Sequence, residues 1–205
     1  MGYVLGTSVG DIGDVVALIG PDAAGKDRAR VRARARALDE EHPEQAGSGP
    51  TVAAALEDIL AGRDLDPAAG GAYARAFHVM AGASFREGPS LGPFPRPAAL
   101  FGRLDEELER LGVARELRPV AFVFGGLPAG GFALPDHADP VLGWLDLVHA
   151  APLAEAYEKV DDQLEEGFRD VARELVAVAR HALRAAERRP ARGRGRPTGI
   201  LTHLA

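Results

Sequence analysis

The pattern of hydrophobic and polar positions is clearest between Pro97 and Gly126. In the first half of this stretch, apolar residues recur every three or four positions and acidic residues lie mostly off that stripe, as in an amphipathic helix with an apolar face of Leu100, Phe101, Leu104, Leu108 and Leu111. Pro97 suits a first helical turn, and Gly112 suits the left-handed residue that ends a helix. The pattern predicts a helix between these two residues.

The second half of the stretch has a different pattern. Val120 to Phe124 is a run of five apolar residues without alternation, and Gly125 and Gly126 close it. A strand that is covered on both faces has this pattern. We therefore predict that Val120–Phe124 is a buried strand at the centre of the fold.

The N-terminal half carries one strand pattern followed by helical patterns. Tyr3–Ser8 is predicted as a strand. The segment between Phe85 and Pro97 holds three prolines, so we predict an irregular surface loop there with Phe94 exposed. Helices are predicted from four apolar stripes: Ile12, Val15, Val16 and Ile19; Val31, Ala35 and Leu38 in a weakly docked surface helix; Val52, Leu56, Ile59 and Leu60, capped by Thr51 and stopped by Gly62; and Tyr73, Phe77 and Met80.

The C-terminal half supplies a strand, two helices and a closing strand. The predicted segments are a Gly/Pro loop at Leu127–Pro140, a strand within Val141–His149, a helix from Pro152, a long helix from Phe168 to about Arg189, and a last strand in TGILTHLA. We expect an α+β fold in which helices pack around a small, mostly antiparallel sheet of the N-terminal, central and C-terminal segments. Residues 1–205 are predicted to form a single domain, with a basic connector at 190–197 before the closing strand.

The distribution of charged residues along the chain limits the kinds of partner that the protein can bind. The net charge is −6, and because the five arginines between Arg188 and Arg196 have no acid among them, residues 1–187 carry −11. Such a surface repels nucleic acid. The chain has no cysteine, no apolar run long enough to span a membrane, and no basic segment followed by a long apolar core at its start. We therefore expect a cytoplasmic protein that does not enter the membrane.

The order of these segments resembles the YfbM-like family of small uncharacterised bacterial proteins. The resemblance rests on the MGYVLGTS start, the ALEDILAGR helix end, the AFVFGG run, the LVHAAPLAEAYEKV step into a helix, and the long final helix with its short closing strand. It implies an α+β domain. The family has no established activity, so the resemblance supplies no catalytic residue.

The sequence GPDAAGKD is similar to a phosphate-binding loop. Gly20, Gly25 and Lys26 fit the spacing G-x-x-x-x-G-K, but Asp27 stands where that loop needs the serine or threonine that ligates magnesium. A phosphate-binding loop also follows a strand, and DVVALI fits a helix as well as a strand. The alternative interpretation is the stop of one helix followed by the start of the next.

A second candidate site lies in PDHADP, after the run predicted as the central strand. Asp136, His137 and Asp139 are residue types that bind hard or borderline metal ions, and loops often carry functional groups. No second cluster of ligands accompanies them, and the same letters form an ordinary turn. We therefore assign no metal ion and no cofactor.

A third candidate, RGRGRP, resembles the AT-hook, in which arginines enter the narrow minor groove of A/T-rich DNA. Arg192, Arg194 and Arg196 would make those contacts. A basic connector of this kind also forms a solvated loop, as the Arg28–Arg36 run forms a solvated helix face.

These patterns leave the enzyme question open and favour binding. The leading hypothesis is a non-enzymatic binding or regulatory protein, of the immunity type, that covers a basic surface of another protein with its acidic body. The alternative is a nucleotide- or metal-using enzyme built on GPDAAGKD or PDHADP, for which the two loops must converge in space. Contact with the DNA minor groove through RGRGRP is the third hypothesis.

Overall fold

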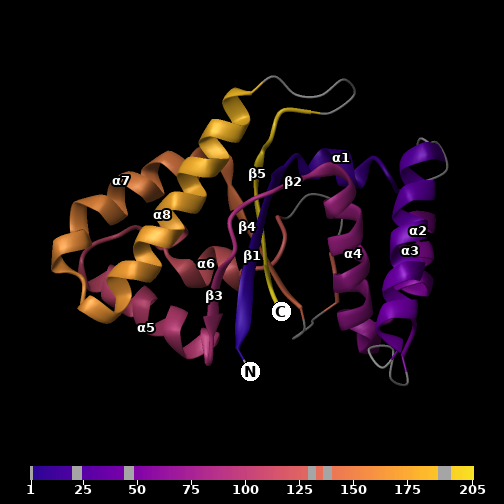
Figure 1. Cartoon of the computed structure of the whole chain (residues 1–205), viewed down its shortest axis with the longest axis horizontal. Coiled ribbons are helices and arrows are strands. Elements are labelled where there is room, and N and C mark those ends of the chain that lie inside the picture. Colours follow the sequence, from indigo (N-terminus) through magenta and orange to yellow (C-terminus); the bar gives the residue numbers. More distant parts are fainter. Residues whose placement is uncertain (1, 20–24, 44–48, 129–132, 136–139, 189–194) are drawn as a thin grey trace.

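A five-stranded antiparallel sheet lies between two groups of helices (Figure 1). The structure is a computed structural model, and it describes residues 2–19, 25–43, 49–128, 133–135, 140–188 and 195–205. Its elements are β1 (Tyr3–Gly10), α1 (Ile12–Val16), α2 (Gly25–Glu41), α3 (Val52–Ala61), α4 (Gly70–Ser84), β2 (Arg86–Glu87), β3 (Leu91–Phe94), α5 (Pro97–Arg110), α6 (Pro119–Val123), β4 (Val141–Asp146), α7 (Ala150–Val160), α8 (Glu166–Glu187) and β5 (Gly199–Leu204). The predicted α+β class is confirmed.

The sheet is organised around the first and last strands of the chain. Its order is β2-β1-β5-β4, and β3 also pairs with β1. Thr202 of β5 lies opposite Thr7 of β1 on one side and opposite Gly143 of β4 on the other. The predicted strands at Tyr3–Ser8, within Val141–His149 and in TGILTHLA are therefore confirmed.

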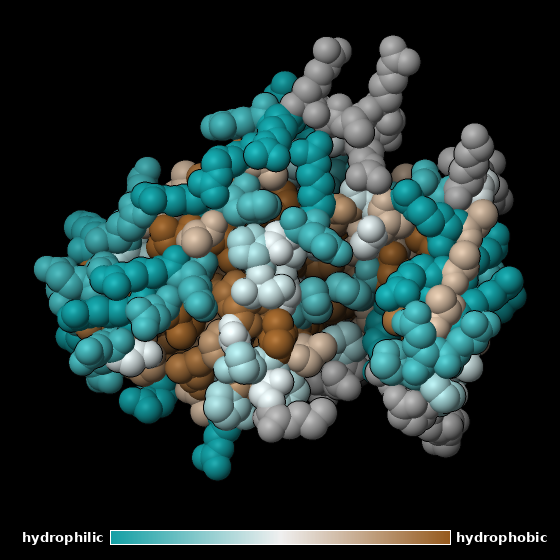
Figure 2. Space-filling model, in the orientation of Figure 1, coloured by the Kyte–Doolittle hydropathy of each residue, from teal (hydrophilic) through white to brown (hydrophobic). Residues whose placement is uncertain are grey.

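Alternate residues of β5 point into two different cores, because side chains alternate between the faces of a strand. Ile200 and Leu204 pack with α5, α7 and α8, and Leu201 packs with α1, α3 and α4. Figure 1 shows these two helix groups on opposite sides of the strands. Figure 2 shows hydrophilic side chains over the outer faces of α7, α8 and α2, whereas hydrophobic residues reach the surface near the strands.

The prediction of a central strand at Val120–Phe124 is wrong. Pro119–Val123 forms the short helix α6, and Val120 is 41% exposed. Pro119 occupies the first helical position, where its missing N–H costs nothing, and the side chain of Asp105 accepts the N–H of Val120 at 3.0 Å. The hydroxyl of Thr202 donates to the carbonyl of Phe122 at 3.0 Å, which fixes α6 against the sheet. A short apolar run suits a buried helix as well as a strand, and here tertiary contacts select the helix.

The predicted irregular loop between Phe85 and Pro97 is also partly wrong. It contains β2 and β3, and Phe94 is only 6% exposed. The Phe94 ring packs edge-on against Phe101 of α5, with 5.3 Å between the ring centroids. Pro93 is tolerated because β3 pairs only with β1, so its other edge needs no N–H.

The predicted helices are present, although the first, α1, ends at Val16 and leaves Ile19 in the turn that follows. The ends of the others follow the expected signals. The Thr51 hydroxyl accepts the N–H of Ala54 at 3.2 Å, and Gly62 adopts φ of 65° at the end of α3. Gly112 adopts φ of 79° after α5. However, α2 is docked more firmly than its weak apolar stripe predicts, because Val31 and Ala35 are fully buried against α3 and α4.

Candidate functional site

The structure does not support the phosphate-binding loop. The described chain before Gly20 is α1 followed by a turn, so the strand that such a loop requires is replaced by a helix. Gly25 and Lys26 lie in the first turn of α2. Gly20 itself lies outside the described residues.

Asp136, His137 and Asp139 also lie outside the described residues. Ile19, which precedes GPDAAGKD, and Pro135, the first residue of PDHADP, line the same cavity of about 740 Å³, together with Arg63 and Asp64. Within the described ranges, no group of three or more His, Asp or Glu side chains is placed to hold a metal ion.

Of the three arginines of RGRGRP, only Arg196 is described, and it is exposed. The backbone beside it is held against acidic residues at the start of α1. The N–H of Gly195 donates to both carboxylate oxygens of Asp14 at 3.3 Å, and the hydroxyl of Thr198 donates to Asp11 at 3.2 Å. Two carboxylates at this point oppose the approach of a DNA phosphate.

A different place in the fold combines a cavity with charged and titratable side chains. A cavity of about 490 Å³ lies between α2 and α4 and reaches β2. It is lined by Arg30, Val31, Arg34 and Leu38 of α2, by His78, Val79, Gly82 and Ala83 of α4, and by Glu87 of β2.

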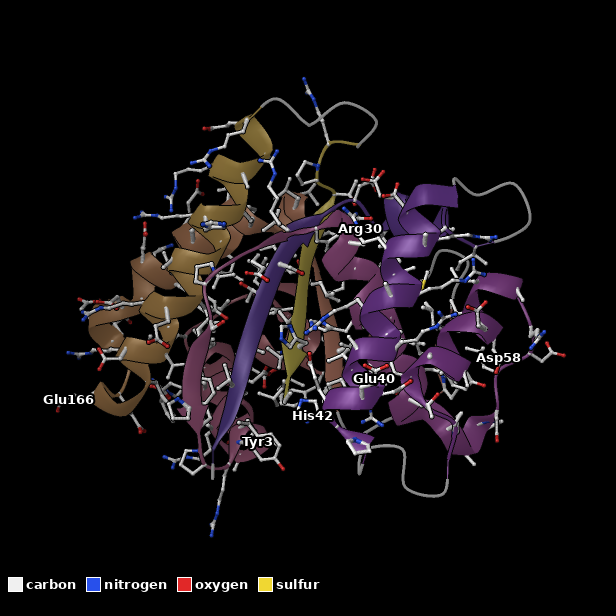
Figure 3. The ribbon with its side chains drawn as sticks, turned by 45° about the vertical axis from the view of Figure 1, so that its right-hand side comes forward. Tyr3, Arg30, Glu40, His42, Asp58 and Glu166 are labelled. Carbon is white, nitrogen blue, oxygen red and sulfur yellow. The ribbon has the colours of Figure 1, made fainter. Side chains whose placement is uncertain are left out.

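The helical repeat places these residues on the cavity wall. Val31 and Ala35 anchor α2 in the core, so the neighbouring stripe at Arg30, Arg34 and Leu38 is turned toward α4. Figure 3 shows Arg30 on the side of α2 that faces the strands. On the opposite wall, His78 and Gly82 are separated by one helical turn, and Glu87 is carried in by the pairing of β2 with β1 opposite Ser8.

The two cavity arginines are held only loosely. Arg30 donates to the carbonyl of Ala83 and lies 3.4 Å from a carboxylate oxygen of Asp27. Arg34 lies 3.6 Å from a carboxylate oxygen of Glu41, and the side chain of Arg34 is 57% exposed. Ion pairs with this exposure contribute little to stability, so a ligand can replace their acidic partners at small cost.

His78 is in contact with a second histidine, His203 of β5. Their ring centroids are 4.1 Å apart and their planes are tilted by 50°. The Nδ1 atom of each ring is buried without a hydrogen-bond partner. A Cβ on Gly6, the neighbour of His203 in β1, would lie 2.1 Å from Cε1 of His203, so only glycine leaves room for the ring at this position.

Burial keeps both imidazoles neutral near pH 7. Burial lowers the pKa of His78, and the charge of Glu87 offsets part of that effect. Burial, and to a lesser extent the charge of His78, lowers the pKa of His203 to about 4. The cavity therefore presents a neutral ring beside two permanent guanidinium cations.

The opposite charges that line the cavity do not pair with one another. Glu87 is exposed and makes no ion pair with Arg30, Arg34 or any other described residue. The arginines take their acidic partners from α2 itself, at Asp27 and Glu41. One wall is thus cationic and another anionic.

The sequence pattern does not reveal this site, because its residues lie on α2, α4 and β2, which are separated along the chain. The predicted solvated face at Arg28–Arg36 also makes specific contacts, and the side chain of Arg32 is still 38% exposed. Arg28 donates to the carbonyls of Leu18 and Leu60, and Arg32 makes a bidentate pair with Glu57 at 2.6 and 2.8 Å that lowers the pKa of this carboxyl. The signal in the sequence for this cavity wall is the i, i+4 spacing of Arg30 and Arg34, which places them on one helix face beside Val31 and Leu38.

Comparison with protein families gives one result. A family model described as "Domain of unknown function (DUF7691)" matches residues 1–196. Neither the curated proteins nor the solved structures give a match. The resemblance to the YfbM-like family is not tested by this result and stays a prediction. None of the described helices has the length and apolar character needed to cross a membrane.

Proposed function

We propose that this chain, which belongs to the DUF7691 family, is a non-enzymatic binding or regulatory protein whose ligand site is the cavity between α2 and α4. One observation carries the proposal: two guanidinium groups, a neutral imidazole and aliphatic side chains line one cavity of about 490 Å³. Ligand sites are typically concave and mostly apolar, with a few polar groups that fix orientation.

The lining indicates the chemistry of the ligand. Guanidinium groups bind carboxylates and phosphates through paired N–H donors. Val31, Leu38 and Val79 offer aliphatic surface next to those donors. A small molecule with a carboxylate and a short aliphatic body fits both features.

Hexanoate is a suitable probe, and hexanamide is its neutral control. In a titration followed by backbone amide NMR, hexanoate should shift the signals of Val31, Val79 and Gly82 with a dissociation constant of about 1 to 10 mM, as expected for a fragment of this size. Hexanamide should bind about tenfold more weakly, because it cannot form the charge-assisted hydrogen bonds.

Matched variants locate the binding. Arg34→Gln should weaken hexanoate binding about tenfold. Arg36→Gln removes an exposed arginine from the same helix that is not part of the cavity wall, and it should leave binding unchanged. Equal effects of the two variants, or no shifts at the cavity residues, would contradict the proposal.

The protein-partner function expected from the sequence is a second candidate. Several arginines of the described body have intramolecular acidic partners, such as Arg63 with Asp58 and Arg173 with Asp161. Carboxylates without an ion pair to another described residue include Glu166, Asp170 and Glu174 of α8. The unpaired charge of this surface is therefore negative, which supports association with a basic protein.

Salt dependence tests this second candidate. A basic partner protein, if a neighbouring gene encodes one, should co-elute with this protein at about 0.05 M NaCl and separate at about 0.5 M, where the Debye length is much shorter. Co-elution that is unchanged by salt would argue against contact through the acidic body.

The enzyme alternative is supported by the convergence of Ile19 and Pro135 on one cavity. It requires that nucleotide bind near Lys26 in the presence of magnesium. We expect calorimetry to show no micromolar binding of ATP with magnesium, because Asp27 replaces the hydroxyl residue and α1 replaces the strand. Micromolar binding of ATP with magnesium that Lys26→Ala abolishes would favour the enzyme hypothesis over the binding-protein hypothesis.

A further inference from the structure

The carboxylate of Glu87 has a position that the binding of a simple anion does not explain. It lies on the wall of the α2–α4 cavity, on β2, and it forms no ion pair with the described residues around it. A carboxylate in an anion site raises the cost of binding the anion, because like charges repel. Glu87 therefore points to a second, positively charged group on the ligand.

The arginines and Glu87 are placed to act on different parts of one molecule. Arg30 and Arg34 project from α2 and have their own acidic partners, Asp27 and Glu41, so they do not neutralise Glu87. Glu87 enters from the sheet, beyond the end of α4. The same cavity also has an aliphatic lining, at Val31 and Val79.

His78 lines the same cavity as a neutral ring at pH 7, because burial lowers its pKa. Its ring rests against His203, which is held over Gly6. Glu87 lines the same cavity, and its negative charge offsets part of the lowering of the His78 pKa. A bound cation beside Glu87 would face a neutral ring rather than an imidazolium ion, so it would meet no repulsion there.

We infer that the ligand of this cavity is a zwitterion of the amino-acid type, with its carboxylate on Arg30 and Arg34, its ammonium group on Glu87, and an aliphatic body against Val31, Leu38 and Val79. This inference rests on the proposed function and specifies its ligand class. No covalent step is involved. A zwitterion satisfies both charged walls at once, whereas hexanoate leaves Glu87 unpaired beside the ligand.

The test compares hexanoate with 6-aminohexanoate, which has the same chain and carboxylate and adds one ammonium group. In the full-length protein, 6-aminohexanoate should bind at least about fivefold more tightly, because one partly exposed charge pair is added. In Glu87→Gln this ratio should fall to about one. Glu174→Gln, on α8 and remote from the cavity, is the matched control and should keep the wild-type ratio.

A charge-reversal variant tests the inference by a reversed ligand preference rather than by a loss of binding alone. Glu87→Lys should invert the preference, so that hexanoate binds more tightly than 6-aminohexanoate. Fluorescence of the single tryptophan, Trp144, which is buried, verifies that each variant is folded.

The outcomes separate the two proposals. Equal binding of both probes by the wild type, or a preference that persists in Glu87→Gln and Glu87→Lys, would overturn the zwitterion inference. The proposal of an anion-binding site would be unaffected by either result. If neither probe shifts the cavity residues, the site itself is wrong and the inference falls with it.

Discussion

His78 of α4 and His203 of β5 are in direct ring contact, with 4.1 Å between their centroids, although 125 residues separate them in the sequence. Both rings are largely buried, and neither Nδ1 atom has a hydrogen-bond partner. The pair joins a cavity-lining helix to the centre of the sheet. Its protonation state therefore couples the cavity to the stability of the fold.

The first prediction concerns the pH dependence of stability. The pKa of His203 is about 4 in the folded state, below its ordinary value of 6.5, so the folded state binds fewer protons than the unfolded state between these values. The stability contribution is complete above pH 6.5 and is lost as the pH falls toward 4. Urea unfolding of the wild type at pH 7 and pH 5 should show this as a loss of about 1 to 2 kcal/mol beyond that of His203→Gln.

Carboxylates also titrate in this range, so the comparison between variants decides the result. His181→Gln, on α8 and away from His78, should keep the wild-type difference between the two pH values. The same pH dependence in wild type and His203→Gln would show that His203 is not the group responsible.

The second prediction concerns the space beneath His203. Gly6→Ala places a methyl group 2.1 Å from Cε1 of the ring, so the ring or the strand must move. We expect a loss of about 1 to 3 kcal/mol in the free energy of unfolding, as for other overpacked sites.

Gly102→Ala in α5 is the control for the general effect of replacing glycine. A Cβ there meets nothing within 4 Å, and alanine in a helix interior should stabilise by about 0.5 to 1 kcal/mol. Denaturant unfolding of both variants measures the contrast. A neutral Gly6→Ala would mean that His203 is not confined by β1.

The third prediction distinguishes the two sides of α6. Phe122 is 4% exposed and Val120 is 41% exposed. Phe122→Ala should therefore cost about 3 to 5 kcal/mol, as for other buried aromatic side chains, and Val120→Ala should cost less than about 1 kcal/mol. A fully buried strand would make both substitutions costly, so equal large losses in chemical denaturation would restore the strand interpretation.

The fourth prediction concerns the basic connector. The full-length protein should show no preference for A/T-rich over G/C-rich duplexes at about 0.15 M salt, because Asp11 and Asp14 hold the segment beside Arg196 and the body is acidic. A peptide spanning Arg188–Gly199 is free of both constraints and should show some preference. Gel-shift titration of both species compares them, and sub-micromolar, A/T-selective binding by the intact protein would establish a DNA-binding role.

The sequence by itself determined the features that depend on neighbouring residues. The stripe of Leu104 and Leu108 produced the buried face of α5, because helical side chains three or four positions apart share a face. Thr51 capped α3 and Gly62 ended it, because these signals act within a few residues. The first and last strands were identifiable for the same local reason.

Only the tertiary structure decided the features that depend on distant partners. The Val120–Phe124 run became a helix because Asp105 caps its start and Thr202 binds its end. Phe94 became buried because Phe101 packs against it. None of these three partners can be read from the local pattern.

The candidate site belongs to this second class. Its walls come from α2, α4 and β2, and His203 arrives from the last strand of the chain. The residue types were visible in the sequence, but periodicity specifies which face of an element is apolar and not which elements meet. Here the meeting is set by the pairing of β1 with both β2 and β5, which places Glu87 and His203 on either side of the first strand and within reach of α4.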